Sequence, residues 1–207
     1  MDVKQFCNTR PYLYHLTARE NVALIRAQGA LVPAAELFVR ANRGDLLREH
    51  RKGHRRIRVG DHELVARDQD PLREGNCALP EGFEFEDLIG LLNEHVFFWP
   101  GTAEGPIAAG RNHFGRYVEE HGAQVLRLPT TSALTANPRP LFCRYNSGAP
   151  RCNPRIGRSP RGWETFVTAD QFYGRPSDVV ECVYRGAVTL PKDAEYFLLN
   201  DRALWTE

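Results

Sequence analysis

The order of the secondary-structure patterns along the chain constrains its fold more than any other feature. Patterns typical of helices are concentrated in the first half, whereas short β-forming runs dominate the second half. A doubly wound parallel sheet needs strands and helices that alternate, and segregated elements are typical of α+β domains. With 207 residues, the chain has the length of one ordinary domain. We therefore predict a single α+β domain over residues 1–207, with its helices mainly in the N-terminal half.

Hydrophobic periodicity locates the individual elements. Strands are expected at residues 11–17, 95–99, 124–128, 141–145, 179–184 and 196–199, and helices after Thr17, after Pro33 as far as Leu47, at 85–93 and at 106–120. Thr17 and Glu20 have the spacing of a capping box, and Gly29 is suited to end the helix that they begin. Pro100-Gly101 is expected to stop the strand before it. Residues 146–162 are rich in Gly, Pro, Asn and Arg and are expected to form a long loop.

Positive charge is concentrated in two segments of the chain. Residues 40–58 carry eight cations against Asp45 and Glu49, and residues 144–162 carry five arginines and no acid. The formal net charge is only +1, so the rest of the chain is acidic. Basic segments on an acidic body are typical of contact with nucleic acid or nucleotide phosphates, which arginine grips bidentately. An ordinary solvated surface is the alternative. The candidate contacts are Arg55, Arg56 and Arg151.

The sequence lacks the motifs of several classes of protein. No apolar run approaches the roughly 20 residues of a membrane-spanning helix, and the first six residues lack the basic-then-apolar layout of a signal peptide. The five cysteines contain no Cys-x-x-Cys pair, which argues against a disulfide framework or a zinc ribbon. Glycine-rich nucleotide loops, the His-Glu-x-x-His motif and the Gly-x-Ser-x-Gly elbow are also absent. We therefore expect a cytoplasmic protein without membrane contact or bound metal.

Three isolated features carry chemistry. His15 lies in the first expected strand, and Phe97-Phe98-Trp99 forms an aromatic strand. Each of these residue types is more often part of a core than of a site. Glu181 is more informative, because a carboxylate among Val180, Cys182 and Val183 interrupts an apolar run. It either faces solvent, as strand alternation allows, or is held in a cleft for a reason.

Taken in order, these features resemble the ADP-ribosyltransferase fold of the His-aromatic-Glu kind, and more narrowly the DarT-like enzymes that modify nucleic acids and related bacterial domains. The resemblance covers roughly residues 12–199 and depends on these stretches: Tyr14-His15-Leu16-Thr17, Glu20-Asn21 with Gly29, Leu92 to Trp99, and Val180-Glu181-Cys182-Val183. It implies a split, mostly antiparallel β core. This chain departs from the family at the central aromatic, which is often tyrosine, and at Val179, where arginine-modifying enzymes usually carry Gln or Glu. The second departure points away from arginine as acceptor.

The resemblance also implies NAD as co-substrate and a role for each feature. Glu181 would be the catalytic carboxylate, stabilising the positive charge that develops on the ribose as nicotinamide leaves. His15 would hold the adenosine-side ribose, assisted by Thr17. One aromatic side chain among Phe97, Phe98 and Trp99 would stack on nicotinamide. This hypothesis requires that His15, one of these rings and Glu181 line one cleft.

The acceptor would be chosen by residues 171–175, just before the glutamate. Phe172 and Tyr173 can stack on a base beside Arg175, although the same rings can equally anchor the loop. Together with the basic segments, this favours a nucleic-acid acceptor, and an effector of toxin or phage-defence type with an antitoxin or immunity partner. Two alternatives stay open: the same fold acting on a protein or small molecule, and a non-catalytic module that binds nucleic acid.

Overall fold

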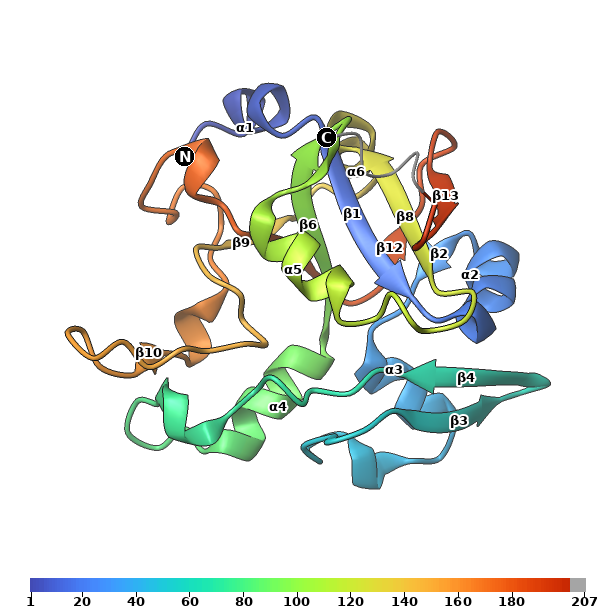
Figure 1. Cartoon of the computed structure of the whole chain (residues 1–207), viewed down its shortest axis with the longest axis horizontal. Helices are drawn as coiled ribbons and strands as arrows, with labels where there is room; N and C mark the ends of the chain where they lie inside the picture. Colours follow the sequence, from blue (N-terminus) through green and yellow to red (C-terminus); the bar gives the residue numbers. More distant parts are fainter. Residues whose placement is uncertain (202–207) are drawn as a thin grey trace.

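The computed structural model describes residues 1–201 and confirms the predicted α+β class (Figure 1). Its centre is an antiparallel sheet in the order β13-β8-β1-β6-β11-β9, with β7 paired to β6. The strands are β1 (Tyr12–Thr17), β6 (His95–Thr102), β7 (Gly105–Pro106), β8 (Gln124–Pro129), β9 (Leu141–Cys143), β11 (Glu181–Arg185) and β13 (Glu195–Leu198). Each central strand therefore pairs with partners distant in sequence.

Helices and short ribbons surround this sheet. The α-helices are α1 (Val3–Thr9), α2 (Val22–Gln28), α3 (Ala34–Arg40), α4 (Phe85–Asn93), α5 (Ala108–Gly115) and α6 (Thr130–Ala136). The 3-10 turns are η1 (Arg19–Asn21), η2 (Gly44–Leu46), η3 (Glu74–Asn76), η4 (Trp163–Thr165) and η5 (Pro176–Asp178). The strand pairs are β2 (Ala30–Leu31) with β12 (Val188–Thr189), β3 (Arg55–Val59) with β4 (His62–Ala66), and β5 (Cys77–Ala78) with β10 (Ser159–Pro160). Among residues 1–201, no helix combines the length and apolarity needed to cross a membrane.

The two central strands of the sheet separate halfway along their length. β1 pairs with β6 from Tyr12 opposite Gly101 to Tyr14 opposite Trp99. Beyond that point β1 continues against β8 as far as Thr17, whereas the first half of β6 pairs with β11 instead. Figure 1 shows β1 and β6 diverging towards the end of the molecule that carries α3, α4 and the β3–β4 ribbon. The sheet is therefore split.

Strand alternation gives β6 two different faces. Val96 and Phe98 point into the main core, which they share with Leu13 and Cys182. Phe97 and Trp99 lie on the opposite face, which belongs to two separate apolar clusters. The split opens on this second face. The face on which a side chain of β6 lies therefore decides whether it packs in the main core or lines the site.

The structure corrects the expected boundaries around the first two helices. Thr17 ends β1 instead of capping a helix, and α2 begins only at Val22, after the turn η1. Gly29 does end α2, with a left-handed φ of 59°. The helix after Pro33 ends at Arg40, because the chain turns back at Asn42, where φ is 54°. The basic segment therefore continues as a turn and a β-ribbon.

Later elements begin and end at other residues than expected, because pairing between distant strands outweighs the local effect of proline and glycine. β6 runs through Pro100-Gly101, since both residues pair with β1. A Cβ at Gly101 would lie 2.2 Å from the Gly105 oxygen, so β7 can approach only because position 101 is glycine. The helix expected over 106–120 is confined to α5, and α1, α6 and the β3–β4 ribbon were not predicted.

Candidate functional site

A cavity of about 280 Å³ lies at the split of the sheet. His15 and Thr17 line it from β1, Phe97 and Trp99 from β6, and Glu181 from the first position of β11. These residues come from three strands that are far apart in sequence. The split therefore brings the histidine, two of the aromatic rings and the glutamate to one cavity, which is the arrangement that the family resemblance requires.

His15 bridges the split. Its Nδ1 lies 2.9 Å from the carbonyl oxygen of Phe97, on the strand from which β1 has separated. Because a carbonyl only accepts, Nδ1 carries the hydrogen and Nε2 is left as an acceptor. Burial lowers the pKa of His15 to about 4, so the ring is neutral at pH 7. A neutral ring with a free acceptor is suited to bind a hydroxyl group.

Thr17 and Asn21 fasten the wall of the cavity beside this histidine. The buried Thr17 accepts a hydrogen bond from the Asn21 side chain at 3.2 Å. The same Asn21 amide accepts from the backbone nitrogen of Val65 at 2.8 Å and donates to its oxygen at 3.0 Å. Asn21 therefore replaces a strand partner for β4 and holds the β3–β4 ribbon against the end of β1.

Glu181 is the most unusual side chain in the cavity. It is only 2% exposed, and its Oε1 accepts a hydrogen bond from the Ser147 backbone nitrogen at 3.1 Å. Its Oε2 is buried and has no hydrogen-bond partner within residues 1–201. Burial raises the pKa of this carboxyl from 4.5 to about 7. A buried acceptor without a partner is costly for the free protein and is a common feature of sites that bind a ligand.

Arg161 positions the loop that contacts this glutamate. Its buried guanidinium donates to the carbonyl oxygens of Asn146 at 2.7 Å and Ser147 at 3.1 Å, and lies 4.5 Å from the centre of the Tyr145 ring. Its positive charge also lowers the pKa of Glu181 and so opposes the effect of burial. Arg161 belongs to the second basic segment in the sequence, yet in the structure it is a positioning residue.

The three candidate aromatic residues divide between site and core. Phe97 is half-buried and Trp99 is 6% exposed, and both line the cavity. Phe98 is fully buried on the other face, with its ring 6.0 Å from that of Tyr184. The structure therefore removes Phe98 from the candidates for stacking on a ligand and leaves Phe97 and Trp99.

The opposite wall of the cavity holds residues that sequence reasoning missed. Arg51 is buried and donates to Asn93 Oδ1 at 2.9 Å and to the Arg67 carbonyl oxygen at 3.0 Å. Arg67 pairs with Glu120 through both terminal nitrogens and lies 4.5 Å above the Tyr117 ring. His113 stands beside Trp99, and burial lowers its pKa to about 4. No spacing rule could identify the two arginines, because they flank the β3–β4 ribbon, whose fold back over the split was not predicted.

The residues expected to select the acceptor are not brought together. Phe172 is 3% exposed and packs in the main core beside Phe142, so it cannot stack on a base. Tyr173 is 89% exposed, and Arg175 is exposed and ion-paired with Asp178 at 3.3 Å. The alternative that the loop is anchored by its own aromatic residue is therefore correct for Phe172.

The two basic segments differ in the structure. Arg55 pairs with Glu49, and Arg56 pairs with Glu63 and with Glu20. Three further arginines of the first segment are ion-paired: Arg40, Arg43 and Arg48. Four arginines of the second segment are exposed and form no ion pair within residues 1–201: Arg144, Arg151, Arg155 and Arg158. Within residues 1–201 the second segment thus holds four exposed cations without an ion pair and the first holds two, Lys52 and Arg58, whereas Arg55 and Arg56 are paired with acids.

The cavity combines the groups that a nucleotide needs. His15 Nε2 and the Glu181 carboxylate are suited to sugar hydroxyls, the rings of Phe97 and Trp99 to a planar base, and Arg51 and Arg67 to phosphate. Its volume is near the lower end of the roughly 300–1,000 Å³ typical of ligand pockets, so it fits a nucleoside-sized part of a ligand. Within the described residues, no group of three or more His, Cys, Asp or Glu side chains is placed to hold a metal ion.

The raised pKa of Glu181 predicts a pH-dependent cost in stability. Between pH 4.5 and about 7 the folded chain binds this proton more tightly than the unfolded chain, so stability decreases as the pH rises through this range. The shift corresponds to about 3 kcal/mol. We expect Glu181→Gln to exceed the wild type in unfolding free energy by about that amount at pH 8, and by much less at pH 5. Urea denaturation at both pH values measures this difference.

Glu119 provides the control for this measurement, because it is exposed and forms no ion pair within residues 1–201. Glu119→Gln should track the wild type at both pH values. An advantage of Glu181→Gln that is equal at pH 5 and pH 8 would show that the Glu181 carboxyl is not desolvated.

A profile of one protein family matches most of the chain. This family of unknown function (DUF7002) aligns with residues 11–193, which include every cavity-lining residue described above. No curated protein and no solved structure gives a significant match to the chain. Its function must therefore be inferred from the site.

Proposed function

This chain belongs to a family of unknown function (DUF7002), and we propose from its site that it is an NAD-dependent mono-ADP-ribosyltransferase with a nucleic-acid acceptor. One observation carries the proposal. Glu181, buried and with one oxygen unpartnered, lines the same cavity as His15, which bridges the split between β1 and β6. A purely structural carboxylate at this position would be expected to have partners for both oxygens.

NAD supplies a ribose carbon attached to a positively charged nicotinamide ring, which leaves as a neutral molecule and needs no proton. The bond from this carbon to nicotinamide breaks with its electron pair passing to nicotinamide, and a bond from a nucleophilic atom of the acceptor forms. Positive charge that develops on the ribose is stabilised by the Glu181 carboxylate, which is buried and therefore interacts with a nearby charge more strongly than a carboxylate on the surface does. Glu181 also takes the proton of the acceptor, for which a pKa of about 7 is well matched.

The other cavity residues hold the dinucleotide in place. The neutral His15 accepts a hydrogen bond from a ribose hydroxyl through Nε2. Phe97 or Trp99 stacks on the nicotinamide ring. Arg51 is the cation best placed to contact the phosphates, because it lines the cavity without an ion pair among the described residues, whereas Arg67 lines the cavity but pairs with Glu120. None of these side chains needs to move a proton, so their contribution is binding and orientation.

A nucleic acid is favoured as acceptor by the charge of the surface. The exposed Arg151, Arg155 and Arg158 form no ion pair within the described part of the chain, so their positive charge is available to a polyanion. The position two residues before Glu181 is Val179, which is fully buried and cannot contact an arginine side chain of a protein acceptor.

The experiment that tests the proposal follows both products of the reaction. The enzyme is incubated with labelled NAD and one acceptor in each reaction: single-stranded DNA, RNA or total cell protein. Label on the acceptor and free nicotinamide are both measured. We expect label on DNA or RNA with an equal amount of nicotinamide released. Label on protein alone would contradict the proposed acceptor. A well-folded protein that releases no nicotinamide with any acceptor would contradict the activity and favour a binding module.

A further inference from the structure

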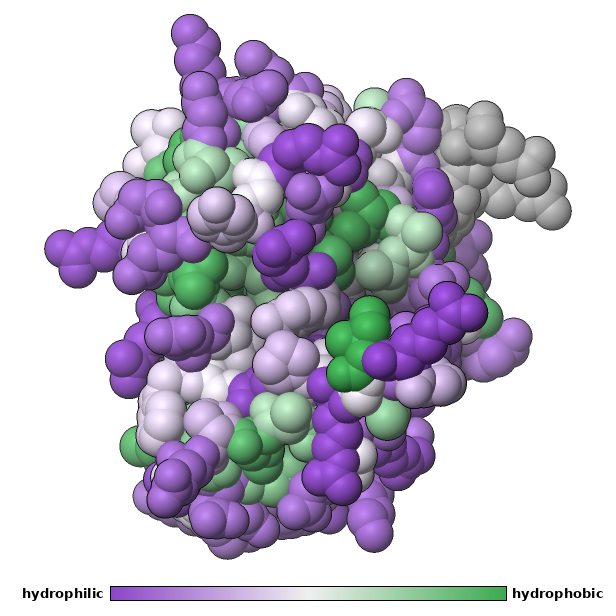
Figure 2. Space-filling model, turned by 90° about the vertical axis from the view of Figure 1, so that its left-hand side faces the viewer, coloured by the Kyte–Doolittle hydropathy of each residue, from purple (hydrophilic) through white to green (hydrophobic). Residues whose placement is uncertain are grey.

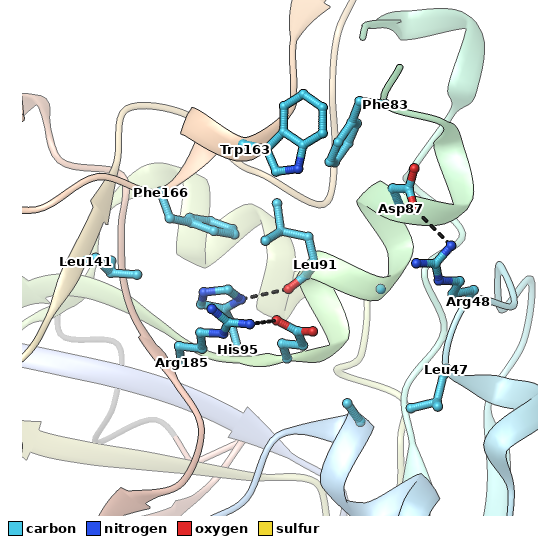
Figure 3. Close-up of a pocket in the computed structure, with 13 residues that line it drawn as sticks. Leu47, Arg48, Phe83, Asp87, Leu91, His95, Leu141, Trp163, Phe166 and Arg185 are labelled. Carbon is cyan, nitrogen blue, oxygen red and sulfur yellow. Dashed lines mark hydrogen bonds and ion pairs between the residues drawn. The ribbon is translucent and has the colours of Figure 1, made fainter. Parts of the chain in front are cut away.

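A second and larger cavity, of about 570 Å³, lies outside the site described above (Figure 3). It is a groove between α4, η4 and the end of β11, and we call it the aromatic groove. Its walls carry Phe83, Trp163 and Phe166, with Leu91 between them. Trp163 is 62% exposed, which is unusual for the largest apolar side chain. Large exposed aromatic residues in a groove are typical of ligand contact.

The rings of the groove are arranged to receive another flat group. Trp163 and Phe83 meet edge to face with ring centres 4.8 Å apart. Phe166 lies 4.7 Å from the His95 ring and 5.7 Å from the Phe97 ring. His95 lines both cavities and is held by its Nδ1, which donates to the Leu91 carbonyl oxygen at 2.7 Å. The aromatic groove is therefore separated from the candidate active site by little more than one imidazole ring.

Two ion pairs form the polar rim of the groove. Arg48 pairs with Asp87 at 2.9 Å, as Figure 3 shows, and Arg185 pairs with Glu94 at 2.9 Å. Both arginines are largely exposed. The rim thus presents donors and acceptors of both signs, which suits the hydrogen-bonding edge of a nucleobase more than a purely apolar ligand. Its charges cancel, so the groove alone does not attract a polyanion.

The attraction for a polyanion comes from the segment that leads into the groove. We call residues 144–158 the arginine arm, since they carry the four exposed and unpaired arginines. The arm is followed by β10, which pairs with β5, and then directly by Trp163. Figure 2 views the molecule from the side of β10, where apolar side chains reach the surface among hydrophilic ones. Arg158, the last arginine of the arm, precedes Trp163 by five residues, which an extended chain spans in about 17 Å at most. A nucleic acid bound to the arm therefore has a base within reach of Trp163.

Strand geometry connects the groove to Glu181. Glu181 and Arg185 are four residues apart on the same face of β11, which corresponds to about 13 Å. Arg185 lines the groove and Glu181 lines the active-site cavity. One polymeric ligand can therefore occupy the groove with one of its bases and present a neighbouring nucleotide to Glu181.

We propose that the aromatic groove is the binding site for a nucleobase of a single-stranded nucleic acid, with the adjoining phosphates on the arginine arm. Trp163 stacks on the base, and Arg48 and Arg185 contact its polar edge. Its role in selecting the acceptor rests on the proposed transferase function, whereas the binding itself does not. Stacking on aromatic side chains tolerates any base, so preference for single strands over duplex is the property that the groove confers.

Binding without NAD tests the groove independently of catalysis. Fluorescently labelled single-stranded DNA, single-stranded RNA and duplex DNA of equal length are titrated with the wild type, Trp163→Ala and Leu198→Ala. Leu198 is the control, because it is an exposed apolar side chain on β13, at the opposite edge of the sheet. We expect Trp163→Ala to weaken single-strand binding about tenfold or more, and Leu198→Ala to have no effect. The DNA and RNA titrations show which sugar the site accepts.

Several outcomes would overturn the proposal. One is an unchanged affinity of Trp163→Ala for single strands. The others are equal affinity of the wild type for duplex and single strands, and no binding of either single strand by the wild type. Hydrolysis of NAD without nucleic acid, in which water takes the ADP-ribose and nicotinamide leaves, separates the two proposals, because it needs the Glu181 cavity and not the aromatic groove and should therefore not depend on Trp163. Trp163-dependent binding by a protein that never cleaves NAD would support the groove and refute the transferase. A protein that cleaves NAD and binds single strands equally well without Trp163 would support the transferase and refute the groove.

Discussion

Replacement of Glu181 by glutamine is expected to reduce nicotinamide release from NAD by at least about 100-fold while the protein stays folded. Glutamine keeps the shape of the side chain and can still accept the hydrogen bond from the Ser147 nitrogen. It lacks the negative charge that stabilises the ribose and the base that takes the acceptor proton. Loss of one preorganised electrostatic group in a buried site typically lowers kcat by about 10²–10³.

The size of this effect follows from the environment of the carboxylate. Glu181 is almost completely buried, and its second oxygen has no partner within the described residues. A charge in such surroundings interacts strongly with a developing positive charge, because little water is present to screen it. The same carboxylate on the surface would contribute far less.

The measurement compares initial rates of nicotinamide release for the wild type, Glu181→Gln and Glu119→Gln. Glu119→Gln changes the net charge by the same amount at an exposed position and should keep the wild-type rate. Because Glu181→Gln is expected to be more stable than the wild type at pH 8, loss of activity at that pH cannot be ascribed to unfolding. Residual activity within tenfold of the wild type would exclude Glu181 as the catalytic carboxylate.

Glu181 was accessible from sequence because it breaks a local pattern, whereas His15 and the aromatic strand were identified through the family resemblance. A carboxylate amid Val180, Cys182 and Val183 indicates either an exposed strand face or a buried functional group. The side chain is only 2% exposed, which decides for burial, and β11 is enclosed in this way because it pairs with β6 on one side and β9 on the other. The sequence pattern therefore identified the residue, but tertiary pairing determined its environment.

The phosphate-binding candidates were not accessible, because charge alone does not reveal pairing. Arg55 and Arg51 lie in the same basic segment, yet Arg55 pairs with Glu49 and Arg51 is buried in the cavity wall. Arg67 lies outside that segment and still lines the cavity. Arg161 belongs to the segment with free charge and is nevertheless buried beneath the loop that contacts Glu181. The net charge of a segment indicates the class of partner, whereas the role of each arginine depends on the residues that surround it in the folded chain.

Strand alternation places the aromatic residues of β6 on two faces but does not say which face is the core. Phe98 shares its face with Val96, and the fold buries that face against Leu13 and Cys182. Phe97 and Trp99 face the split. A shift of one residue in the pairing of β6 would exchange these roles, so the register with β1 and β11 fixes the site.

The register predicts opposite consequences for two neighbouring phenylalanines. Phe98→Ala should lower the free energy of unfolding by about 3–5 kcal/mol, the usual cost of truncating a fully buried phenylalanine. Phe97 is only half-buried, so Phe97→Ala should cost less stability. It should instead raise the KM for NAD, because its ring lines the cavity and Phe98 does not.

Urea denaturation and NAD saturation kinetics on both variants separate the two faces of the strand. If Phe97 and Trp99 both stack on the nicotinamide ring, Phe97→Ala should raise the KM for NAD by a few-fold. Trp99→Ala should raise the KM by more than Phe97→Ala does. An unchanged KM in both variants would mean that the split does not hold the nicotinamide end of the substrate. A Phe98→Ala variant with wild-type stability and a raised KM would mean that Phe98, and not Phe97, faces the cavity, so that β6 would be shifted by one residue. Because β11 pairs with β6, the same shift would also move Glu181 away from the cavity.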